Sequence, residues 1–456
     1  MRMAVDGFLG ILAYGRELRK NERLTRSGVE AMQRGKLSAL VRYAKSHSEF
    51  YGKLYRDVDP GNFRLADLPV IDKDVLMEHF DTLVTDKSLK RKDLESFLAH
   101  PGRPLYGNRY YVMSSGGSSG KTGIFVYDRK EWRTVIAGTY RWTRMIRGSG
   151  IKVPRTRVAS VTSPKPEHPS HLIGKCLDIG VTNKLNLYAG DDCESMIYRL
   201  NAFQPEVLIG YSSMVDYWAS AQIGGRLRIR PRVVATNSEL RTPAMEANIE
   251  TAWGVKPFCQ YSMTELLSLS SDCAERRGIH VFEDLGIVEA VDGENRPVPD
   301  GTKSSRILVT NLYNFTQPII RYRIDDMLTM EGGNCPCGME FRRITAIHGR
   351  EAVRFRFRDR KGRETVVTSL DLLMLLESEP GIREYQVLVD GGGIHLAIVA
   401  DGQAQEGIRT GLTRAFTAHF DGLDIPVAEI SVSFVDRIER NPKSGKRMPF
   451  IDGTGS

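Results

Sequence analysis

A run of hydroxyl-bearing residues, glycines and one lysine is the part of the sequence best suited to chemistry. It lies between two β-rich runs, Tyr-Val-Met and Ile-Phe-Val-Tyr. Glycines let backbone N–H groups converge on one point, hydroxyls add donors without bulk, and the lysine adds positive charge. These features suit the phosphates of a nucleotide. The residues expected to contact them are Ser114, Ser115, Gly116, Gly117, Ser118, Ser119, Gly120 and Lys121.

The alternative for this run is a flexible Ser/Gly linker, against which the embedded Lys121 and the flanking strands argue. It is not a Walker loop, because a strand-like run follows it where a Walker loop opens a helix. The run resembles the phosphate loop of the adenylate-forming ligases, a superfamily that includes acyl-CoA synthetases and the adenylation domains of peptide synthetases. If this resemblance is genuine, the other motifs of that superfamily should follow in the same order along the chain.

Two later segments resemble such motifs. The first, Ala-Thr-Asn-Ser238-Glu239-Leu, is similar to the Gly-Ala-Glu-Pro segment that lines the adenine. The second, Gln-Tyr261-Ser-Met-Thr264-Glu265, is similar to the Tyr-Gly-x-Thr-Glu motif. An aromatic ring can stack on adenine, a threonine hydroxyl can bond a phosphoryl oxygen, and a carboxylate can hold Mg2+, the role expected of Glu265. Taken alone, the second segment also suits an ordinary strand-to-helix cap.

A third segment, Pro318-Ile-Ile-Arg-Tyr-Arg-Ile-Asp-Asp326, resembles Pro-x-x-Arg-Tyr-Arg-Thr-Gly-Asp. Its last residue, Asp326, is expected to accept hydrogen bonds from the ribose hydroxyls, as acidic residues do in other nucleotide sites. Asp325 stands where the family has a glycine. This departure is one reason to consider a non-catalytic homologue.

The last two segments lie toward the C-terminus. Gly349-Arg350 resembles the Gly-Arg that opens the C-terminal domain of the family, so Arg350 is expected to reach the ribose or a phosphate. Ser444-Gly-Lys446 resembles the segment that carries the catalytic lysine. That lysine neutralises the charge that builds up between the substrate carboxylate and the α-phosphate. The alternative for this stretch is a disordered basic tail.

The resemblance extends from residue 111 to residue 446. Within the superfamily, the chain length, the short helical N-terminal region and the segment 271–284 resemble the phenylacetate-CoA ligase branch. The resemblance implies an α/β fold of the adenylate-forming enzymes, with a large N-terminal domain of several subdomains and a small α+β C-terminal domain. It also implies ATP-dependent activation of an aryl or small organic acid to an acyl-adenylate, release of pyrophosphate, and transfer of the acyl group to CoA as a thioester.

The second half of that reaction is where the sequence departs from the family. The family continues Gly-Arg-x-Asp-Asp into a Gly-rich strand that lines the pantetheine tunnel, whereas here Glu351-Ala-Val and an Arg-Phe-Arg-Phe-Arg run follow Arg350. An amine, a protein thiol or another small nucleophile therefore remains an alternative acceptor. For the acid itself, Tyr140, Trp142 and Tyr211 are candidates to flank an aryl group, with burial in the core as the alternative.

Four residues have the chemistry of a metal site. Three thiols and one imidazole form a plausible closed tetrahedral set of ligands for structural Zn2+. The spacing of the Cys-x-Cys pair is tighter than that of a usual zinc knuckle, so four unrelated buried or reduced residues are the alternative. The candidate ligands are Cys273, His280, Cys335 and Cys337.

The elements that must position these residues follow from the hydrophobic patterns. Apolar residues at three- and four-residue steps predict helices over residues 12–100, with Asp72 capping one of them. Short β-rich runs alternating with helical segments then predict a layered α/β body. At 456 residues the chain is long enough for more than one unit. The pattern changes near residue 349, and the family resemblance implies an N-terminal adenylation domain over residues 1–348 and a mobile C-terminal lid over residues 349–456.

Composition narrows the classes of partner. A net charge of +8 admits nucleic acid, and the alternating Arg and Phe of residues 354–358 add to that hypothesis, but nucleic-acid binding leaves the ordered motifs unexplained. No apolar run approaches the ~20 residues that span a bilayer, so no membrane partner is expected. Six cysteines in a chain of this length do not suggest a disulfide framework, and we expect a cytoplasmic enzyme. A homodimer is compatible with the sequence.

Overall fold

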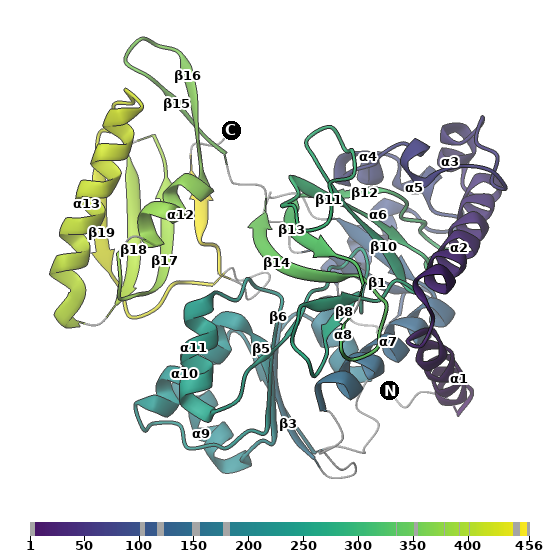
Figure 1. The fold of residues 1–456 in the computed structure, drawn as a ribbon, viewed down its shortest axis with the longest axis horizontal. Helices are drawn as coiled ribbons and strands as arrows, with labels where there is room; N and C mark the ends of the chain where they lie inside the picture. Colours follow the sequence, from purple (N-terminus) through teal and green to yellow (C-terminus); the bar gives the residue numbers. More distant parts are fainter. Residues whose placement is uncertain are drawn as a thin grey trace. The chain divides into compact units, whose positions relative to one another are not determined.

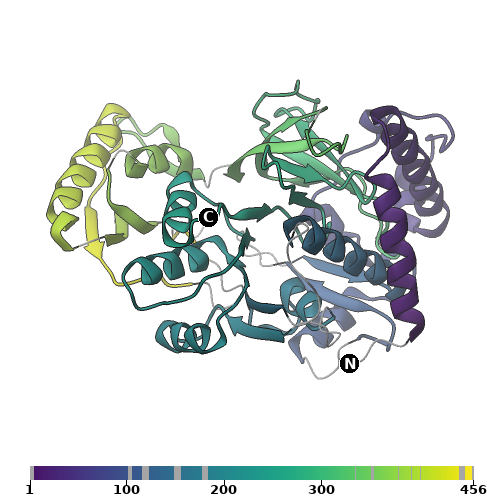
Figure 2. The same ribbon diagram turned by 60° about the horizontal axis from the view of Figure 1, so that its bottom comes forward.

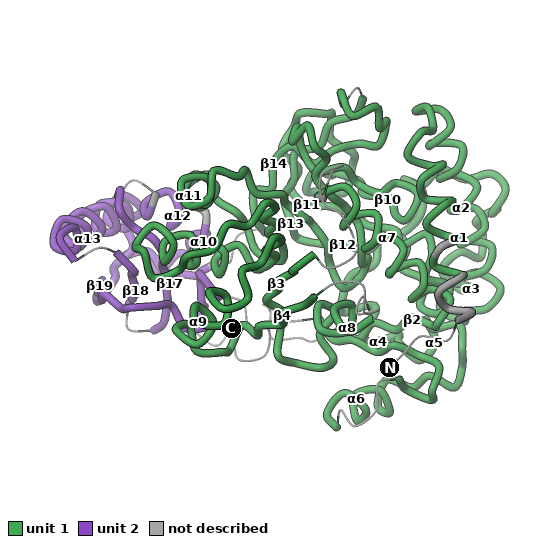
Figure 3. Tube along the Cα trace, turned by 90° about the horizontal axis from the view of Figure 1, so that it is seen from below, with its two compact units in different colours: residues 1–349, 443–445 green, residues 350–442, 446–456 purple. Residues whose placement is uncertain are grey.

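The computed structural model of the protein describes residues 5–100, 105–115, 123–147, 156–176, 183–333, 335–350, 354–377, 379–391, 393–400, 402–440 and 447–453. The described chain forms two compact units, coloured in Figure 3. The first runs to Gly349 and the second begins at Arg350.

The first hundred residues are helical, as the spacing of their apolar residues predicts. Thr25 and Asp72 begin the helices α2 and α4 by accepting hydrogen bonds from the backbone N–H groups of Gly28 and Val75, which confirms the predicted cap at Asp72. None of the described helices has the length and apolar character needed to cross a bilayer. The elements are α1 (Val5–Asn21), α2 (Arg26–His47), α3 (Glu49–Leu54), η1 (Leu65–Asp67), α4 (Lys73–Glu78), α5 (Phe80–Leu83) and α6 (Arg91–Ala99).

A parallel five-stranded sheet is the centre of the layered α/β body. Its strands run in the order β4-β3-β5-β6-β7, and every neighbouring pair is parallel. The strands are β3 (Arg157–Thr162), β4 (Asn183–Tyr188), β5 (Val207–Tyr211), β6 (Val233–Asn237) and β7 (Phe258–Gln260). The helices are α7 (Arg129–Arg147), α8 (Pro169–Cys176), α9 (Cys193–Phe203), α10 (Ser212–Ile223) and α11 (Pro243–Trp253).

Both faces of this sheet are covered, which is why its strands are nearly continuous apolar runs. On one face, Trp142 and Ile146 of α7 pack against Val158, Val207 and Val233. On the other face lie α9, α10 and α11, as Figure 1 shows, and Trp218 and Ile249 are part of the core there. The predicted α/β fold class is confirmed.

Three smaller antiparallel sheets complete the first unit. One is a hairpin, one has the order β10-β11-β12, and one has the order β13-β14-β9-β8. The hairpin is formed by β1 (Tyr111–Ser114) and β2 (Ile124–Tyr127). The other strands are β8 (Ser270–Asp272), β9 (Ile279–Val281), β10 (Gly286–Val291), β11 (Arg306–Asn311), β12 (Tyr322–Ile324), β13 (Asp326–Glu331) and β14 (Arg343–Arg350).

The second unit is a small α+β body with its own core, which includes Phe355, Leu396 and Phe416. Its main sheet has the order β19-β18-β17-β20, and β15 pairs with β16 as a separate hairpin. Its elements are β15 (Arg354–Arg358), β16 (Glu364–Thr368), α12 (Ser369–Glu377), β17 (Ile382–Val389), β18 (Ile394–Ala400), η3 (Gly402–Ala404), α13 (Gln405–Gly422), β19 (Ile430–Phe434) and β20 (Phe450–Asp452).

The β15–β16 hairpin does not have the character of a nucleic-acid surface. Phe355 is fully buried and Phe357 packs edge-on against Phe420, so neither ring is a platform for bases. Arg356 pairs with Glu364 across the hairpin, and Arg363 with Asp359. The alternation of Arg and Phe is therefore that of a strand with one core face and one ion-paired face.

The helix α1 is held to the body by a buried ion pair. Arg141 of α7 binds Asp284 at 2.6 Å and Glu22 at 3.1 Å, and its Nη2 also donates to the carbonyl oxygen of Leu18. Figures 1 and 2 both show α1 beside α7. Burial acts to raise the pKa of Asp284, but the charge and hydrogen bonds of Arg141 and the amide of Asn21 outweigh it and hold that pKa below its ordinary value.

We expect Asp284→Asn to lower the free energy of unfolding by about 3–5 kcal/mol at neutral pH, because it leaves Arg141 buried without its main counter-ion. A carboxyl with a lowered pKa stabilises the fold above its unfolded pKa and loses that effect as pH falls through the folded value. The difference between wild type and variant, measured by urea unfolding, should therefore shrink in acid. Asp67→Asn is the control, because Asp67 pairs with Arg64 on the exposed surface and should change little. A loss for Asp284→Asn no larger than that of the control would contradict the role of the pair.

Candidate functional site

The strand order of the parallel sheet predicts where a ligand binds. From β3 the chain crosses to β4 on one side and then to β5 on the other, so β3 and β5 flank a topological switch point. In open parallel sheets, ligands bind outside the carboxyl ends of the strands at such a point. Ser238 and Glu239 directly follow β6, and Tyr261 directly follows β7, at this same edge.

Glu239 joins the ends of two neighbouring strands. Its carboxylate accepts hydrogen bonds from the backbone N–H of Ser213 at 3.0 Å and from the Ser213 hydroxyl at 2.6 Å, at the beginning of α10. A carboxylate at a helix N-terminus is favourable because of the helix dipole. Ser238 has a φ of 65°, the left-handed region that costs energy for a non-glycine residue. The turn after β6 is thus strained and is held in place by α10.

Tyr261 and Asp326, far apart in the sequence, meet directly. The Tyr261 hydroxyl donates to the Asp326 carboxylate at 2.6 Å. The backbone of Tyr261 is held by the buried Ser270, whose hydroxyl accepts from the Tyr261 N–H at 3.1 Å and donates to its carbonyl oxygen at 2.5 Å. An aromatic ring and a carboxylate are therefore side by side, as a site for a base and its ribose requires.

The predicted phosphate loop closes the β1–β2 hairpin. Ser114 lies opposite Ile124 in the antiparallel register, and beyond that pair the Ser115 N–H donates to the Gly123 carbonyl oxygen at 2.9 Å. The Gly123 N–H donates back to the Ser115 hydroxyl at 3.0 Å. A strand, β2, follows the loop, as the sequence predicts. Gly116, Gly117, Ser118, Ser119, Gly120 and Lys121 lie outside the described residues.

The hairpin is fastened to the Thr264-Glu265 segment by a fully buried tyrosine. The Tyr127 hydroxyl, at the end of β2, lies 3.0 Å from the carbonyl oxygen of Thr264 and 3.2 Å from that of Glu265. The Asn311 side-chain amide donates to the same Glu265 oxygen at 3.1 Å. Tyr127 is 137 residues from Thr264 and 138 residues from Glu265 in the sequence. The contact therefore brings together two segments that are distant in the chain.

The outer edge of β2 is paired by side chains. Gln317 accepts from the Val126 N–H at 2.9 Å and donates to the Ile124 carbonyl oxygen at 3.0 Å, and Asn314 donates to the Val126 carbonyl oxygen at 2.9 Å. The sequence analysis missed Tyr127, Asn314 and Gln317. The signal in the sequence was the two amide residues Asn314 and Gln317 shortly before Pro318. A buried amide side chain needs hydrogen-bond partners, and the backbone of a neighbouring strand supplies them.

The departure from the family at Asp325 has a simple structural account. Asp325 is exposed and faces Arg323 at 3.6 Å, and Arg323 also pairs with Asp72 at 3.1 Å. Among the described non-glycine residues with positive φ, Asp325 does not appear, so the backbone here does not need a glycine. The left-handed residue of this segment is Arg321, a buried anchor that donates to the carbonyl oxygens of Ala66 and Leu68.

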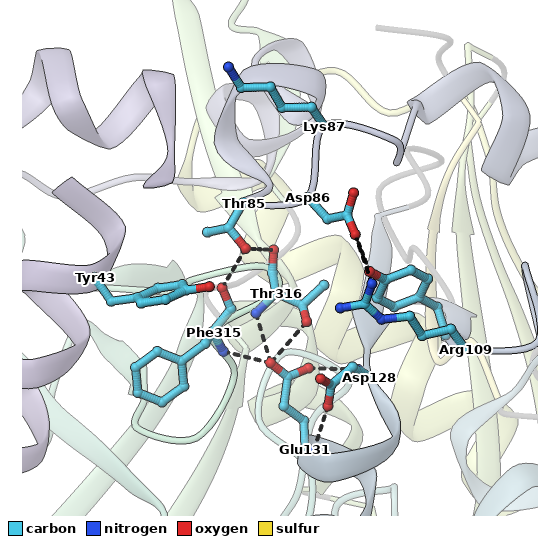
Figure 4. Close-up of a pocket in the computed structure, with 10 residues that line it drawn as sticks. Tyr43, Thr85, Asp86, Lys87, Arg109, Asp128, Glu131, Phe315 and Thr316 are labelled. Atoms are coloured by element: carbon cyan, nitrogen blue, oxygen red, sulfur yellow. Dashed lines mark hydrogen bonds and ion pairs between the residues drawn. The ribbon is translucent and has the colours of Figure 1, made fainter. Parts of the chain in front are cut away.

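Glu131 holds the Asn314–Gln317 segment from the other side, as Figure 4 shows. One carboxylate oxygen accepts from the N–H groups of Phe315 and Thr316 at 2.8 and 2.7 Å, and the other accepts from the Asp128 N–H at 2.6 Å. Burial and the charge of Asp128 raise the pKa of Glu131 to about 7. Glu131 borders a polar cavity of about 320 Å³, lined by Tyr43, Thr85, Asp86, Lys87, Arg109, Tyr110, Asp128, Glu131, Phe315 and Thr316.

The aromatic residues considered for an acyl pocket differ in their positions. Trp142 packs between α7 and the parallel sheet, and Tyr211 is fully buried in the core on the opposite face. Both are core residues, which was the alternative for them. Tyr140 is half-buried and packs against the main core.

The four candidate metal ligands converge. Their ligand atoms all lie within 4.8 Å of one another, with 3.6 Å between the sulfurs of Cys273 and Cys335 and 3.4 Å from the Cys337 sulfur to His280 Nε2. Four ligands around one tetrahedral zinc are roughly 3.3–3.8 Å apart. His280 Nδ1 lies 3.2 Å from the Phe341 carbonyl oxygen and can only donate to it, so Nε2 is the available ligand atom. The set fits a closed, structural zinc.

Outside the phosphate loop, two predicted site residues, Arg350 and Lys446, are described incompletely or not at all. Thr264 and Glu265 lie on the segment beside Tyr127, where Glu265 is buried. Arg350 ends β14, but its side chain is outside the described part of the chain. Lys446 also lies outside the described residues.

Comparisons with known proteins add a family context. No family model matches the chain. Protein CapK of Staphylococcus aureus is 22% identical over 320 residues, which cover 66% of this chain and 63% of CapK, less than two thirds of its length. Phenylacetate-coenzyme A ligase of Thermus thermophilus is 25% identical over 359 residues, 72% of either chain.

Among solved structures, the fold resembles that of 2-hydroxyisobutyryl-CoA ligase. The structure of that enzyme in the postadenylation state with R3-HIB-AMP matches with a TM-score of 0.67 and 20% identity over 95% of this chain and 91% of that one. An open conformation with 2-HIB-AMP and CoA matches with a TM-score of 0.60 and 20% identity over 95% and 94%.

Glu131→Gln is expected to remove a pH-dependent part of the stability. A carboxyl with a raised pKa stabilises the fold below its unfolded pKa and loses that effect as pH rises through the folded value. Between the unfolded value near 4.5 and the folded value of about 7, Glu131 should therefore lower the free energy of unfolding by up to about 3 kcal/mol. Urea unfolding across this range should show that slope in wild type and not in the variant. Glu49→Gln, an exposed carboxyl that pairs with Lys53, should keep the wild-type slope. A slope unchanged by Glu131→Gln would contradict the assignment.

If the metal site is built as the geometry indicates, protein purified without chelators should contain about one zinc per chain by elemental analysis. Cys337→Ser should lose the metal and lower the melting temperature, because it opens the ligand set. Cys193→Ser is the matched control, since Cys193 is a half-buried thiol outside the cluster, and it should keep full zinc. Wild-type protein that is fully folded and free of metal would refute the site.

Proposed function

We propose that this chain, which belongs to the adenylate-forming superfamily and is phenylacetate-CoA ligase-like, uses ATP to activate a carboxylic acid and then transfers the acyl group to CoA. The family resemblance rests on the relatives and solved structures described above. The class of enzyme is an AMP-forming carboxylate ligase. The acid remains to be identified, and an aryl or small organic acid is the proposal.

The observation that carries this proposal is the contact between Tyr261 and Asp326 at the edge of the parallel sheet. The Tyr127 hydroxyl fixes the far end of β2, the strand that follows the phosphate loop, to the segment that follows Tyr261. The ring that we assign to the base, the carboxylate that we assign to the ribose and the hairpin that we assign to the phosphates are thus connected by hydrogen bonds. That combination supports a nucleotide whose triphosphate extends toward the loop.

In the first step, an oxygen of the substrate carboxylate attacks the α-phosphorus of ATP. The bond between that phosphorus and the oxygen bridging to the β-phosphate breaks, and pyrophosphate leaves with the bonding electrons. We assign the backbone N–H groups and Lys121 of the loop to the phosphates, and Lys446 to the charge that builds up on the α-phosphate. Mg2+, held by Glu265, would screen the charge of the phosphates, and Thr264 would orient a phosphoryl oxygen. These roles require positioning and charge, with no protein nucleophile.

In the second step, the thiol sulfur of CoA attacks the acyl carbonyl carbon and the thiol proton passes to solvent. The bond between that carbon and the phosphate oxygen breaks, and AMP leaves with the bonding electrons. The solved 2-hydroxyisobutyryl-CoA ligase binds an acyl-AMP and CoA in one structure, and this chain shares its fold. We propose that residues 349–456 act as the lid that exchanges between the two steps, with Arg350 at the hinge. An amine or a protein thiol as the acceptor is the alternative that follows from the Glu351-Ala-Val sequence after Arg350.

The test is exchange of labelled pyrophosphate into ATP in the presence of a panel of aryl, hydroxy and short aliphatic acids. Acid-dependent exchange is expected, and Lys446→Ala should lower it by at least about a hundredfold because the charge on the α-phosphate is no longer neutralised. Lys361→Ala is the control, an exposed lysine of the second unit that should keep full activity. Consumption of the CoA thiol in the same mixture then tests the acceptor. Exchange in the Lys446→Ala variant equal to wild type would show that the lysine has been misassigned, and exchange with none of the acids would overturn the proposal.

A further inference from the structure

An extended segment before β6 carries four arginines on one side. Arg226, Arg228, Arg230 and Arg232 are all exposed, whereas the residues between them are buried. Leu227 and Ile229 are each 0% exposed. Where the backbone is extended, alternate side chains point the same way and are about 6.6 Å apart. We refer to these four residues as the arginine ridge.

The ridge is held rigidly although it belongs to no sheet. The Asn201 side chain donates to the Arg226 carbonyl oxygen at 3.0 Å and accepts from the Arg228 N–H at 2.7 Å, as a neighbouring strand would. Gln204 donates to the Arg228 carbonyl oxygen at 2.9 Å, and Gln222 accepts from the Ile229 N–H at 3.0 Å. The arginines are thus presented in a fixed row, so little backbone entropy is lost when a partner binds them.

Carboxylates within the described structure neutralise little of this charge. Arg226 pairs with Glu194, and Arg228 Nε donates to the Gly225 carbonyl oxygen. For Arg230 and Arg232, no ion pair with a described carboxylate is present. A row of guanidinium groups with this much unpaired charge attracts anions from solution.

Two large apolar side chains are exposed on the two helices that precede the ridge in the chain. Tyr198 of α9 is 75% exposed and Ile223, at the end of α10, is 53% exposed. Ile197, the neighbour of Tyr198, shares a surface hollow of about 630 Å³ with Arg226 and Arg228. The surface therefore combines cations, a tyrosine and an aliphatic side chain.

We propose that the arginine ridge docks this enzyme on an anionic lipid surface, with Tyr198 and Ile223 entering the headgroup region. Clusters of four or more basic residues bind the negative surface of a bilayer, and tyrosine is favoured at its interface. An isoleucine side chain buries little apolar surface against a phosphate–sugar backbone. The exposed Ile223 therefore favours a lipid surface over a nucleic acid as the partner. This departs from the expectation drawn from the apolar runs alone, because those runs report only on spanning a bilayer.

The position of the ridge makes such docking compatible with catalysis. The ridge precedes the amino end of β6, whereas Ser238 and Glu239 follow its carboxyl end. The two ends of one strand point in opposite directions, so a lipid surface at the ridge leaves the ligand edge of the sheet open. The proposal does not depend on the identity of the acid or of its acceptor.

The experiment is cosedimentation with vesicles of equal parts phosphatidylcholine and phosphatidylglycerol, compared with pure phosphatidylcholine, at physiological ionic strength. Binding to the anionic vesicles only is expected, and it should weaken as salt rises. Each arginine is worth roughly a fivefold factor in the partition coefficient, so the triple variant R228Q/R230Q/R232Q should lose about a hundredfold. Acid-dependent pyrophosphate exchange, measured in parallel, should stay at the wild-type rate.

A matched control separates the ridge from net charge. R64Q/R296Q/R356Q removes the same three charges from exposed arginines elsewhere, and it should keep most of the binding. Tyr198→Ser should reduce the binding that persists at high salt. Equal binding to both kinds of vesicle, an equal loss in the control, or retention on single-stranded RNA or an acidic protein without vesicle binding would each overturn the proposal.

Discussion

The arrangement of the candidate site depends on one buried hydrogen-bonded group, the hydroxyl of Tyr127. It lies where β2 ends and is within hydrogen-bond distance of the carbonyl oxygens of Thr264 and Glu265. A tyrosine hydroxyl buried without partners would cost free energy, so these contacts fix the end of the hairpin relative to the segment after β7. A glycine-rich loop can hold phosphates only if the hairpin that carries it is fixed, and this contact fixes the end of β2 that lies away from the loop. Gln317 and Asn314 fix the other side of β2 by completing its hydrogen bonds.

The candidate metal ligands lie next to the strands that position Tyr261. Cys273 directly follows β8, and β8 carries Ser270, which holds the backbone of Tyr261, and Asp272, which accepts from the Cys259 N–H at 2.6 Å. His280 lies on β9, which pairs with β8. A zinc ion bound by these four residues would tie this short, three-residue strand to its neighbour just beside the candidate nucleotide residues. Short strands have few ladder hydrogen bonds of their own, so an additional cross-link has a large effect on their position.

The differences between expectation and structure follow from what a local pattern can report. The alternation of Arg and Phe in β15 is typical of a strand with one basic face, and that is what the structure contains. Its carboxylate partners, such as Glu364, are visible only once the strands pair. The alternation of the arginine ridge is similar, yet among the described residues no carboxylate forms an ion pair with Arg230. Trp142 was a candidate for the acyl pocket because of its type, and it is a core residue because α7 turns that face toward the sheet.

The sequence by itself determined the order and chemistry of the segments and the helical or β-rich character of each stretch, including the cap at Asp72. These are local properties, set by residue type and spacing. Only the tertiary structure decided which segments meet. The contact of Tyr261 with Asp326, the bracing of β2 by Gln317, and the convergence of Cys273 with Cys335 each join residues from distant parts of the chain. Such contacts depend on how whole elements pack, and packing satisfies buried polar groups that no local pattern identifies as partners.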